Sequence, residues 1–474
     1  MCKKKGEKEM NVLECLFKNW NLNKTALVAG EQSLSYNNLC ANVVSFSKSI
    51  DTKKDVVAIY MGNSIEYIIA YFAILLAGKK AFLLNPLYPI TEVINLVRLV
   101  ECDTVVTDVK DKSLMNLYKV IAPKYSKDVC VNIPSIDDKK EEGAIIVPSS
   151  GTTGNAKLIM LTHGNLMTNV KDIVTSYSEL QSKDAELIIL PLTSIFCNTT
   201  QMLVPFFSCM TVYLWTGGFN MPGIIKEMEM RKITYCQMVP AILRLFAKFY
   251  VKSKVKLPYF KRITIGGEPI SVDELKSISE AIAPIRVLQG YGMTEASPVI
   301  AAQTRKSNGD KYGSSGNVME SVQIRIVAEK GRREGIIWVK GPSICKRTYN
   351  GNSLVNEEDW LDTGDVGYMD EEGELYVCGR EKNIIVVGGM NIYPEEVEGV
   401  IRAYPSVSDV LVYGVKDLMG GENINADIVI REKMDVSELK KFCARYLPIY
   451  KVPTKIQIVS KLDKTYTSKV KRKR

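Results

Sequence analysis

The stretch IIVPSSGTTGNAK, residues Ile145 to Lys157, is the most informative segment of this 474-residue chain. Its apolar start predicts a buried strand that leads into a loop of hydroxyl and glycine residues and then into Lys157. Glycines let backbone N–H groups turn toward an anion, hydroxyls add donors, and the lysine supplies positive charge. The segment therefore predicts a loop that binds polyphosphate, followed by a helix that starts near Thr162.

This loop differs from that of the P-loop kinases and ATPases. Their pattern requires Gly-x-x-x-x-Gly-Lys-Ser/Thr. Here Ala156 stands in place of the second glycine and Leu158 in place of the hydroxyl that binds magnesium. An ordinary strand-to-helix turn would not need the six Ser, Thr or Gly residues that stand in succession at 149–154. The segment therefore indicates phosphate binding by a different kind of loop.

Short apolar segments alternate with helical patterns on both sides of the loop. Strands are predicted at residues 56–61, 81–84, 104–108, 143–147, 186–190, 211–214 and 262–265. A helical pattern at 64–77 separates the first two. This β-α-β order predicts a doubly wound α/β fold.

The pattern changes after about residue 316. Short strands joined by Gly and Asp turns are predicted at 322–327, 335–339 and 374–378. From Asn383 onward the chain has the pattern of a compact α+β unit, with a strand, a helix at 394–403, two more strands and a helix at 436–446. A domain boundary is therefore predicted near residue 380.

Composition excludes several classes of protein. Apolar residues make up 46% and charged residues 24%, and the net charge is +9, as in a globular protein with a large core. Basic residues gather at 3–8 and 469–474, where they are either solvated ends or an attraction for anionic partners. They are not interleaved with aromatics, so no nucleic-acid partner is expected.

Eleven cysteines without a Cys-x-x-Cys pair argue against a zinc ribbon and for a reducing compartment. The longest apolar run, 68–78, is shorter than the roughly 20 residues of a membrane span, so no integral membrane segment is expected. We therefore expect a cytoplasmic protein.

His163 is the only histidine, which excludes histidine-rich metal sites. The sequence also lacks the G-x-S-x-G motif of serine hydrolases of that type.

Five further motifs follow the loop in order. They are GGEP at 266–269, GYGMTE at 290–295, TGD at 363–365, GREKNIIVVGGMNIYPEEVE at 379–398 and KTYTSKVKR at 464–472. Together with the loop they resemble the signatures of the adenylate-forming enzyme superfamily, which contains acyl- and aryl-CoA synthetases, peptide-synthetase adenylation domains and luciferases. The resemblance covers nearly the whole chain.

The resemblance implies a fold of two domains. Residues 1–381 would form a large N-terminal AMP-binding domain with two doubly wound sheets and a small β-barrel region. Residues 382–474 would form a small mobile α+β domain with its hinge at Lys382. The implied activity uses ATP and Mg²⁺ to convert a carboxylic acid into an acyl-AMP, and then passes the acyl group to a thiol.

The resemblance also assigns roles to residues. Phosphates would be held by Ser149, Ser150, Gly151, Thr152, Thr153, Gly154 and Lys157. The adenosine pocket would use Gly267, Glu268, Tyr291, Gly292, Asp365 and Arg380. Thr294 would contact the α-phosphate, and Glu295 would bind Mg²⁺, a hard cation that prefers oxygen ligands.

Lys469 is the residue on which we expect the first chemical step to depend most. Attack of a carboxylate on the α-phosphorus joins two anions, and a cation between them relieves the repulsion. In the family, the C-terminal domain swings at the hinge to remove this lysine and to present the Gly388–Asn391 loop to a pantetheine thiol. This chain departs from the family pattern at Ala156, Leu158, Asn383 and Ser468, and Ser468 lacks the backbone freedom of glycine. A catalytically impaired homologue therefore remains an alternative.

The substrate pocket is expected around Ser194, Ile195, Phe196, Gly266 and Gly290. Relatives that activate α-amino acids carry an aspartate near Phe196, whereas here no acidic residue lies between Glu186 and Glu227. Because a buried unpaired ammonium is costly, we expect an apolar or aromatic carboxylic acid. Coenzyme A is the expected thiol, and the phosphopantetheine of an acyl carrier protein is the alternative.

Overall fold

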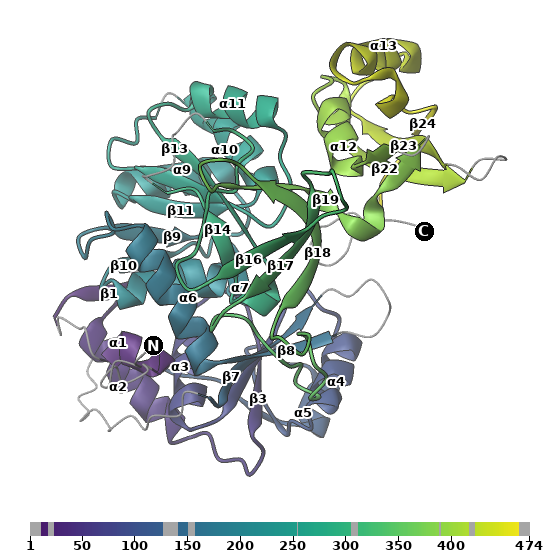
Figure 1. The fold of residues 1–474 in the computed structure, drawn as a ribbon. Coiled ribbons are helices and arrows are strands. Elements are labelled where there is room, and N and C mark those ends of the chain that lie inside the picture. Colours follow the sequence, from purple (N-terminus) through teal and green to yellow (C-terminus); the bar gives the residue numbers. More distant parts are fainter. Residues whose placement is uncertain are drawn as a thin grey trace.

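The computed structural model describes residues 11–17, 23–126, 141–149, 157–253, 255–304, 311–387, 390–416 and 422–463. Within these residues two large sheets form most of the molecule, and a smaller antiparallel sheet lies beside them (Figure 1). The C-terminal segment folds as a separate unit at the upper right of the view. The expected α/β fold with a small β region is confirmed.

The first large sheet has the strand order β6-β5-β3-β4-β7-β8 in the described residues. Its strands are β3 (Val56–Tyr60), β4 (Lys80–Leu84), β5 (Thr104–Val106), β6 (Lys119–Ile121), β7 (Gly143–Ser149) and β8 (Lys157–Thr162). The connecting helices are α3 (Ile65–Leu76), α4 (Ile90–Leu99) and α5 (Lys112–Leu117). All neighbouring strands are parallel except β8, which runs antiparallel to β7.

The second large sheet has the strand order β15-β14-β13-β12-β11-β9-β10-β1-β2. The strands are β1 (Thr25–Ala29), β2 (Gln32–Ser35), β9 (Ala185–Ile188), β10 (Thr211–Leu214), β11 (Tyr235–Met238), β12 (Arg262–Ile265), β13 (Arg286–Gly292), β14 (Val299–Ala302) and β15 (Asn317–Val318). The strands from β1 to β13 in this order are parallel, and β2, β14 and β15 add antiparallel edges.

Helices cover both sheets. They are α1 (Val12–Phe17), α2 (Tyr36–Ser47), α6 (His163–Ser176), α7 (Ile195–Cys197), α8 (Val204–Phe207), α9 (Met221–Met230), α10 (Pro240–Ser253) and α11 (Val272–Ala281), with a π-helix η1 (Asn198–Leu203) and a 3-10 turn η2 (Thr294–Ala296). Every residue of α3 from Ile65 to Leu75 except Glu66 is buried, as expected for a helix that packs between sheets. The largest hydrophobic core joins α3 to α6 and to strands of both sheets.

The small antiparallel sheet consists of β16 (Gln323–Val327), β17 (Gly335–Lys340), β18 (Leu361–Met369) and β19 (Leu375–Arg380). The segment beyond it contains η3 (Glu381–Asn383), β20 (Ile385–Val387), β21 (Met390–Ile392), α12 (Pro394–Arg402), β22 (Val407–Lys416), β23 (Glu422–Ile430), α13 (Val436–Tyr446), η4 (Ile449–Lys451) and β24 (Lys455–Ile458). This segment has a hydrophobic core of its own. The boundary near residue 380 is consistent with that core but stays a prediction.

Two details differ from the sequence-based expectation. The first is strand β8, which was not expected between the loop and the helix and which pairs with β7, with Ser149 opposite Lys157. The expected helix then does begin after Thr162, whose Oγ1 accepts a hydrogen bond of 3.0 Å from the backbone N–H of Asn165. The second difference is strand β18, which contains the TGD motif and was not among the predicted strands.

Candidate active site

The second and third motifs meet at the carboxyl edge of the nine-stranded sheet. Carboxyl ends of parallel strands converge on one edge, and ligands of open α/β sheets bind there. Gly266 follows β12, and Gly290 lies near the end of β13, where Ile265 pairs with Gln289. A side chain at Gly266 would place its Cβ 3.3 Å from the carbonyl oxygen of Gly290. The two glycines therefore allow two motifs to approach closely.

Glu295 connects the third motif with the phosphate-binding loop. It lies in η2 and is 8% exposed, and its Oε1 is 3.9 Å from the Nζ of Lys157. Lys157 is the first residue of β8, so the hairpin brings its charge to the end of β13. At this spacing the lysine can bind a polyphosphate while the carboxylate binds the cation that accompanies it.

Tyr291, Asp365 and Arg380 form a hydrogen-bonded group from three strands. The hydroxyl of Tyr291 donates to Oδ2 of Asp365 over 2.7 Å, and Nε of Arg380 lies 2.7 Å from Oδ1. Asp365 in β18 pairs directly with Arg380 in β19. Burial and the Asp365 carboxylate hold the pKa of Tyr291 well above its usual range, so its hydroxyl remains a donor.

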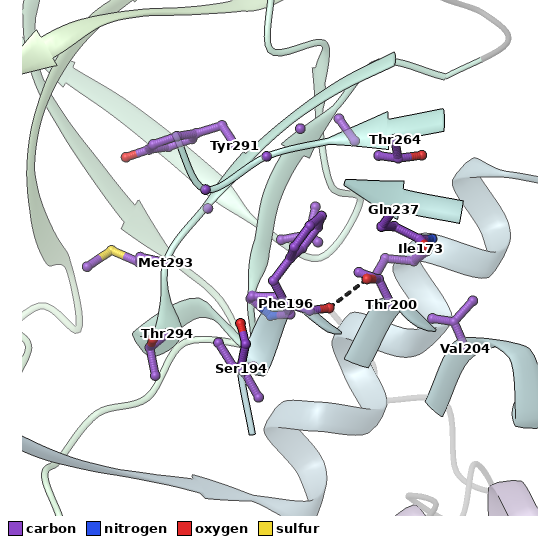
Figure 2. Close-up of a pocket in the computed structure, with 18 of the residues that line it drawn as sticks. Ile173, Ser194, Phe196, Thr200, Val204, Gln237, Thr264, Tyr291, Met293 and Thr294 are labelled. Carbon is purple, nitrogen blue, oxygen red and sulfur yellow. Dashed lines mark hydrogen bonds between the residues drawn. The ribbon is translucent and has the colours of Figure 1, made fainter. Parts of the chain in front are cut away.

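A cavity of about 540 Å³ runs along these groups, a size typical of small-molecule sites. Of the predicted residues, those that line it are Ser194, Ile195, Phe196, Gly266, Gly267, Gly290, Tyr291, Gly292, Thr294, Glu295, Arg380 and Lys382. Figure 2 shows Tyr291, Met293 and Thr294 on one side of the pocket and Gln237, Thr264 and Val204 on the other. The structure thus joins segments from three motifs and from the expected substrate-pocket segment in a single cavity.

Three predicted residues do not line this cavity. Lys157 forms an ion pair with Glu295, and Asp365 accepts a hydrogen bond from Tyr291. Both of these partners line the cavity. Glu268 is half-buried beside Gly267 and does not line the cavity. Ser150, Gly151, Thr152, Thr153, Gly154 and Lys469 lie outside the described residues, as do Ala156, Gly388, Gly389 and Ser468. Ser149 is described only as the last residue of β7.

Four of the polar cavity-wall residues that were not predicted from the sequence lie on strands. They are Glu186, Gln237, Arg262 and Thr264, on β9, β11 and β12. The available signal was the alternation of polar and apolar residues in these strands, such as Arg-Ile-Thr-Ile at 262–265. Because burial raises the pKa of Glu186 to about 8, this carboxyl is mostly uncharged near pH 7 and offers little charge to pair with an ammonium group.

The residues present fit a magnesium nucleotide. Mg²⁺ is usually bound by one or two carboxylates together with substrate phosphates. Glu295 provides one such carboxylate, and within the described residues no group of three or more His, Cys, Asp or Glu side chains forms a self-contained metal site. Gly266, Gly267 and Gly290 leave the wall free of side chains next to Tyr291, where a flat base can stack.

Comparison with known families agrees with this geometry. The family model described as "AMP-binding enzyme" matches residues 17–349, and that of the "AMP-binding enzyme C-terminal domain" matches residues 396–469. The chain belongs to the AMP-binding enzyme family. The predicted membership in the adenylate-forming superfamily and the predicted class, an AMP-forming acid–thiol ligase, are confirmed.

Members of this family with known names resemble the chain along most of its length. A long-chain-fatty-acid–CoA ligase of Haemophilus influenzae is 29% identical, over 88% of this chain and 84% of that protein. A 2-succinylbenzoate–CoA ligase of Bacillus licheniformis is also 29% identical, over 95% of this chain and 96% of that protein. The structure of O-succinylbenzoate coenzyme A synthetase from Bacillus subtilis with ATP and magnesium matches with a TM-score of 0.85 at 27% identity, over 98% of each chain.

In the part of the chain that the structure describes, no helix combines the length and the apolar character needed to cross a membrane. Nine cysteines are described, and all are free thiols. The cytoplasmic location expected from the cysteines stays a prediction.

Proposed function

We propose that this member of the AMP-binding enzyme family activates an apolar or aromatic carboxylic acid with ATP and transfers the acyl group to coenzyme A. The observation that carries the proposal is the single cavity that joins the nucleotide motifs to an apolar wall. That wall includes Ile173, Ile195, Phe196, Val204 and Val299. Relatives from bacteria and plants that act on unlike acids are all named CoA ligases, which favours coenzyme A over a carrier protein.

Six polar residues of the site have a role in this scheme. Tyr291 stacks on the adenine, and Asp365 receives the ribose hydroxyls while Arg380 holds it in place. Glu295 binds Mg²⁺, which neutralises phosphate charge when bound, and Lys157 adds a second cation beside it. Thr294 contacts the α-phosphate, next to the place where the acid's carboxylate must attack.

The C-terminal segment completes the cycle. Lys382 lies in η3 and lines the cavity, so a rotation there moves the chain beyond it relative to the nucleotide. We infer that Lys382 is the hinge between residues 1–381 and 382–474. In one position Lys469 approaches the α-phosphate, and in the other the 388–391 loop approaches the thiol.

The proposed function is tested by measuring pyrophosphate release with ATP, Mg²⁺ and hydroxylamine over a panel of aliphatic, aromatic and amino acids. We expect release that depends on an apolar or aromatic acid, and a thioester when coenzyme A replaces hydroxylamine. A thioester formed only with a carrier protein would support the alternative acceptor. No release with any acid, while ATP still binds, would support the impaired homologue.

We expect Lys469→Ala to reduce acyl-AMP formation by about 100-fold, because the positive charge that offsets repulsion between carboxylate and phosphate is lost. Thioester formation from supplied acyl-AMP and coenzyme A should stay near that of the unmodified enzyme, because no phosphate is attacked in that step. The matched control is Lys471→Ala, two residues further along the same basic run. Equal loss of both half-reactions would contradict the role of Lys469.

A further inference from the structure

One end of the cavity is polar where the architecture favours apolar residues. Parallel strands covered on both faces are usually almost entirely apolar. The register aligns Glu186 with Tyr235 and Arg262, and Gln237 with Thr264, so these side chains share one face of the sheet. The residues between them, which face the other way, are apolar and buried: Leu187, Cys236, Met238, Ile263 and Ile265. Polar residues are therefore confined to the face that the cavity touches.

Arg262 is held rigidly at this end. Only 5% of the residue is exposed, and its guanidinium lies 4.0 Å from the ring centroid of Tyr177 and 4.6 Å from that of Tyr235. Its Nη1 is 2.6 Å from Oε1 of Glu179. Its Nε is buried and has no hydrogen-bond partner among the described residues. Because a buried unpaired donor is costly, this N–H is a candidate for binding a ligand.

Gln237 provides the complementary acceptor. The residue is 7% exposed and lines the cavity, and its Oε1 has no partner in the described part of the chain. The last torsion of a glutamine side chain is broad, so a small rotation turns this oxygen toward a ligand. Thr264 lies beside it with a hydroxyl that can donate or accept (Figure 2).

The cluster is close to electrically neutral. The charge of Arg262 is balanced by Glu179. Glu186, which accepts a hydrogen bond of 3.2 Å from Nε2 of Gln201, is mostly protonated at neutral pH because burial raises its pKa to about 8. A second carboxylate on the ligand would add an uncompensated buried charge, whereas an uncharged group would not.

The cluster lies away from the reacting centre. Arg262 precedes Gly266 by four residues in an extended strand, a distance of about 13 Å. A group that reaches Arg262 is therefore at the opposite end of an acid whose carboxylate lies near Thr294. The π-helix η1 contributes Thr200 to the wall at this end of the cavity. The hydroxyl of Thr200 donates a hydrogen bond of 2.6 Å to the carbonyl oxygen of Phe196. Such helices occur frequently at functional sites.

We propose that Arg262, Gln237 and Thr264 bind a hydroxyl group at the far end of the acyl substrate, so that the substrate is a hydroxylated apolar or aromatic carboxylic acid. The inference rests on the proposed function and narrows it. A hydroxyl accepts a hydrogen bond from the arginine N–H and donates one to the glutamine oxygen, and thereby pairs both buried groups. A methyl group would leave both unpaired, and a ketone would pair only the donor.

The test compares kcat/KM for acyl-AMP formation between matched acids. One pair is octanoic and ω-hydroxyoctanoic acid, and the other is phenylpropanoic and para-hydroxyphenylpropanoic acid. Octanedioic acid, which has a second carboxylate at the far end, tests whether the cluster binds a charged group instead. A site built to bind a hydroxyl rejects the analogue that lacks it, and we expect a preference of about 100-fold for the hydroxylated acid in at least one pair. A preference below about tenfold in both pairs, or a preference for octanedioic acid, would overturn the inference. If only the parent acids, which lack the hydroxyl, were activated, the result would still support the proposed function.

The variants Gln237→Leu and Thr264→Val connect that preference to the cluster. We expect each to lower kcat/KM for the hydroxylated acid about tenfold or more, mainly through KM, and thereby to reduce the preference for the hydroxylated acid over its parent acid. Gln32→Leu, at an exposed glutamine of β2, is the matched control and should change neither value. Equal loss for both acids would indicate a purely structural role and overturn the assignment.

Discussion

Replacement of Glu295 by glutamine is expected to slow acyl-AMP formation by about 1,000-fold, at the upper end of the effect of removing one charge-stabilising group. Glu295 is 8% exposed and its carboxylate has the Nζ of Lys157 at 3.9 Å, so in the absence of nucleotide its charge is balanced within the site. Glutamine keeps the shape but lacks the charge that holds Mg²⁺ against the phosphates. Raising the Mg²⁺ concentration should restore part of the rate.

The measurement is acid-dependent exchange of pyrophosphate into ATP over a range of Mg²⁺ concentrations. Thioester formation from supplied acyl-AMP should be nearly unchanged, because that half-reaction involves no polyphosphate. Glu227→Gln is the matched control, since Glu227 on α9 pairs with Arg231 at 3.0 Å and lies outside the cavity. An exchange rate equal to that of the control would rule out Glu295 as the metal ligand.

Replacement of Gly292 by alanine is expected to destabilise the protein and to reduce acyl-AMP formation by about 100-fold. A Cβ at this position would lie 1.9 Å from the carbonyl oxygen of Pro298, far inside any permitted contact. The obstacle is backbone, so no side chain can rotate away to make room. The adjacent N–H of Met293 donates to the same oxygen over 2.9 Å, and a shift of either segment would also displace Thr294 and Glu295. A misplacement of about 1 Å at a reacting centre can cost a factor of 100.

Gly62→Ala is the matched control, because a Cβ there meets nothing within 4 Å. Thermal unfolding of both variants, with and without ATP, separates the two expected effects. We expect Gly292→Ala to melt at a lower temperature and to gain less stability from ATP, since ligand stabilisation follows affinity. If Gly292→Ala behaved like Gly62→Ala in both assays, the close approach to Pro298 would not constrain the site.

Much of the site could be predicted from the sequence because its residues lie in short contiguous motifs. Tyr291, Thr294 and Glu295 belong to one segment of six residues, so strand β13 carries all three to the same edge. The prediction was weaker where local pattern alone was used. Strand β18, which contains Thr363 to Asp365, was not among the predicted strands, and Gly364 adopts a positive φ of 67° within it.

Strand β8 was missed for a related reason. Its sequence, Lys157 to Thr162, is short and precedes a clear helix start at Thr162, and pairing with β7 is visible only in the fold. The consequence for the site is considerable, because the hairpin positions Lys157 beside Glu295. If a helix stood in place of β8, the side chain of Lys157 would point in another direction.

By itself, the sequence determined the α/β fold, the family signatures and the chemical class of reaction, since these depend on local pattern and on residues adjacent in the chain. Only the tertiary structure decided which side chains share the substrate cavity. Glu186, Gln237 and Arg262 come from three strands that are separated in the sequence and are aligned only by the register of a parallel sheet. That register results from packing of the whole domain, because long-range pairing is set by burial of the sheet faces and by the crossover helices.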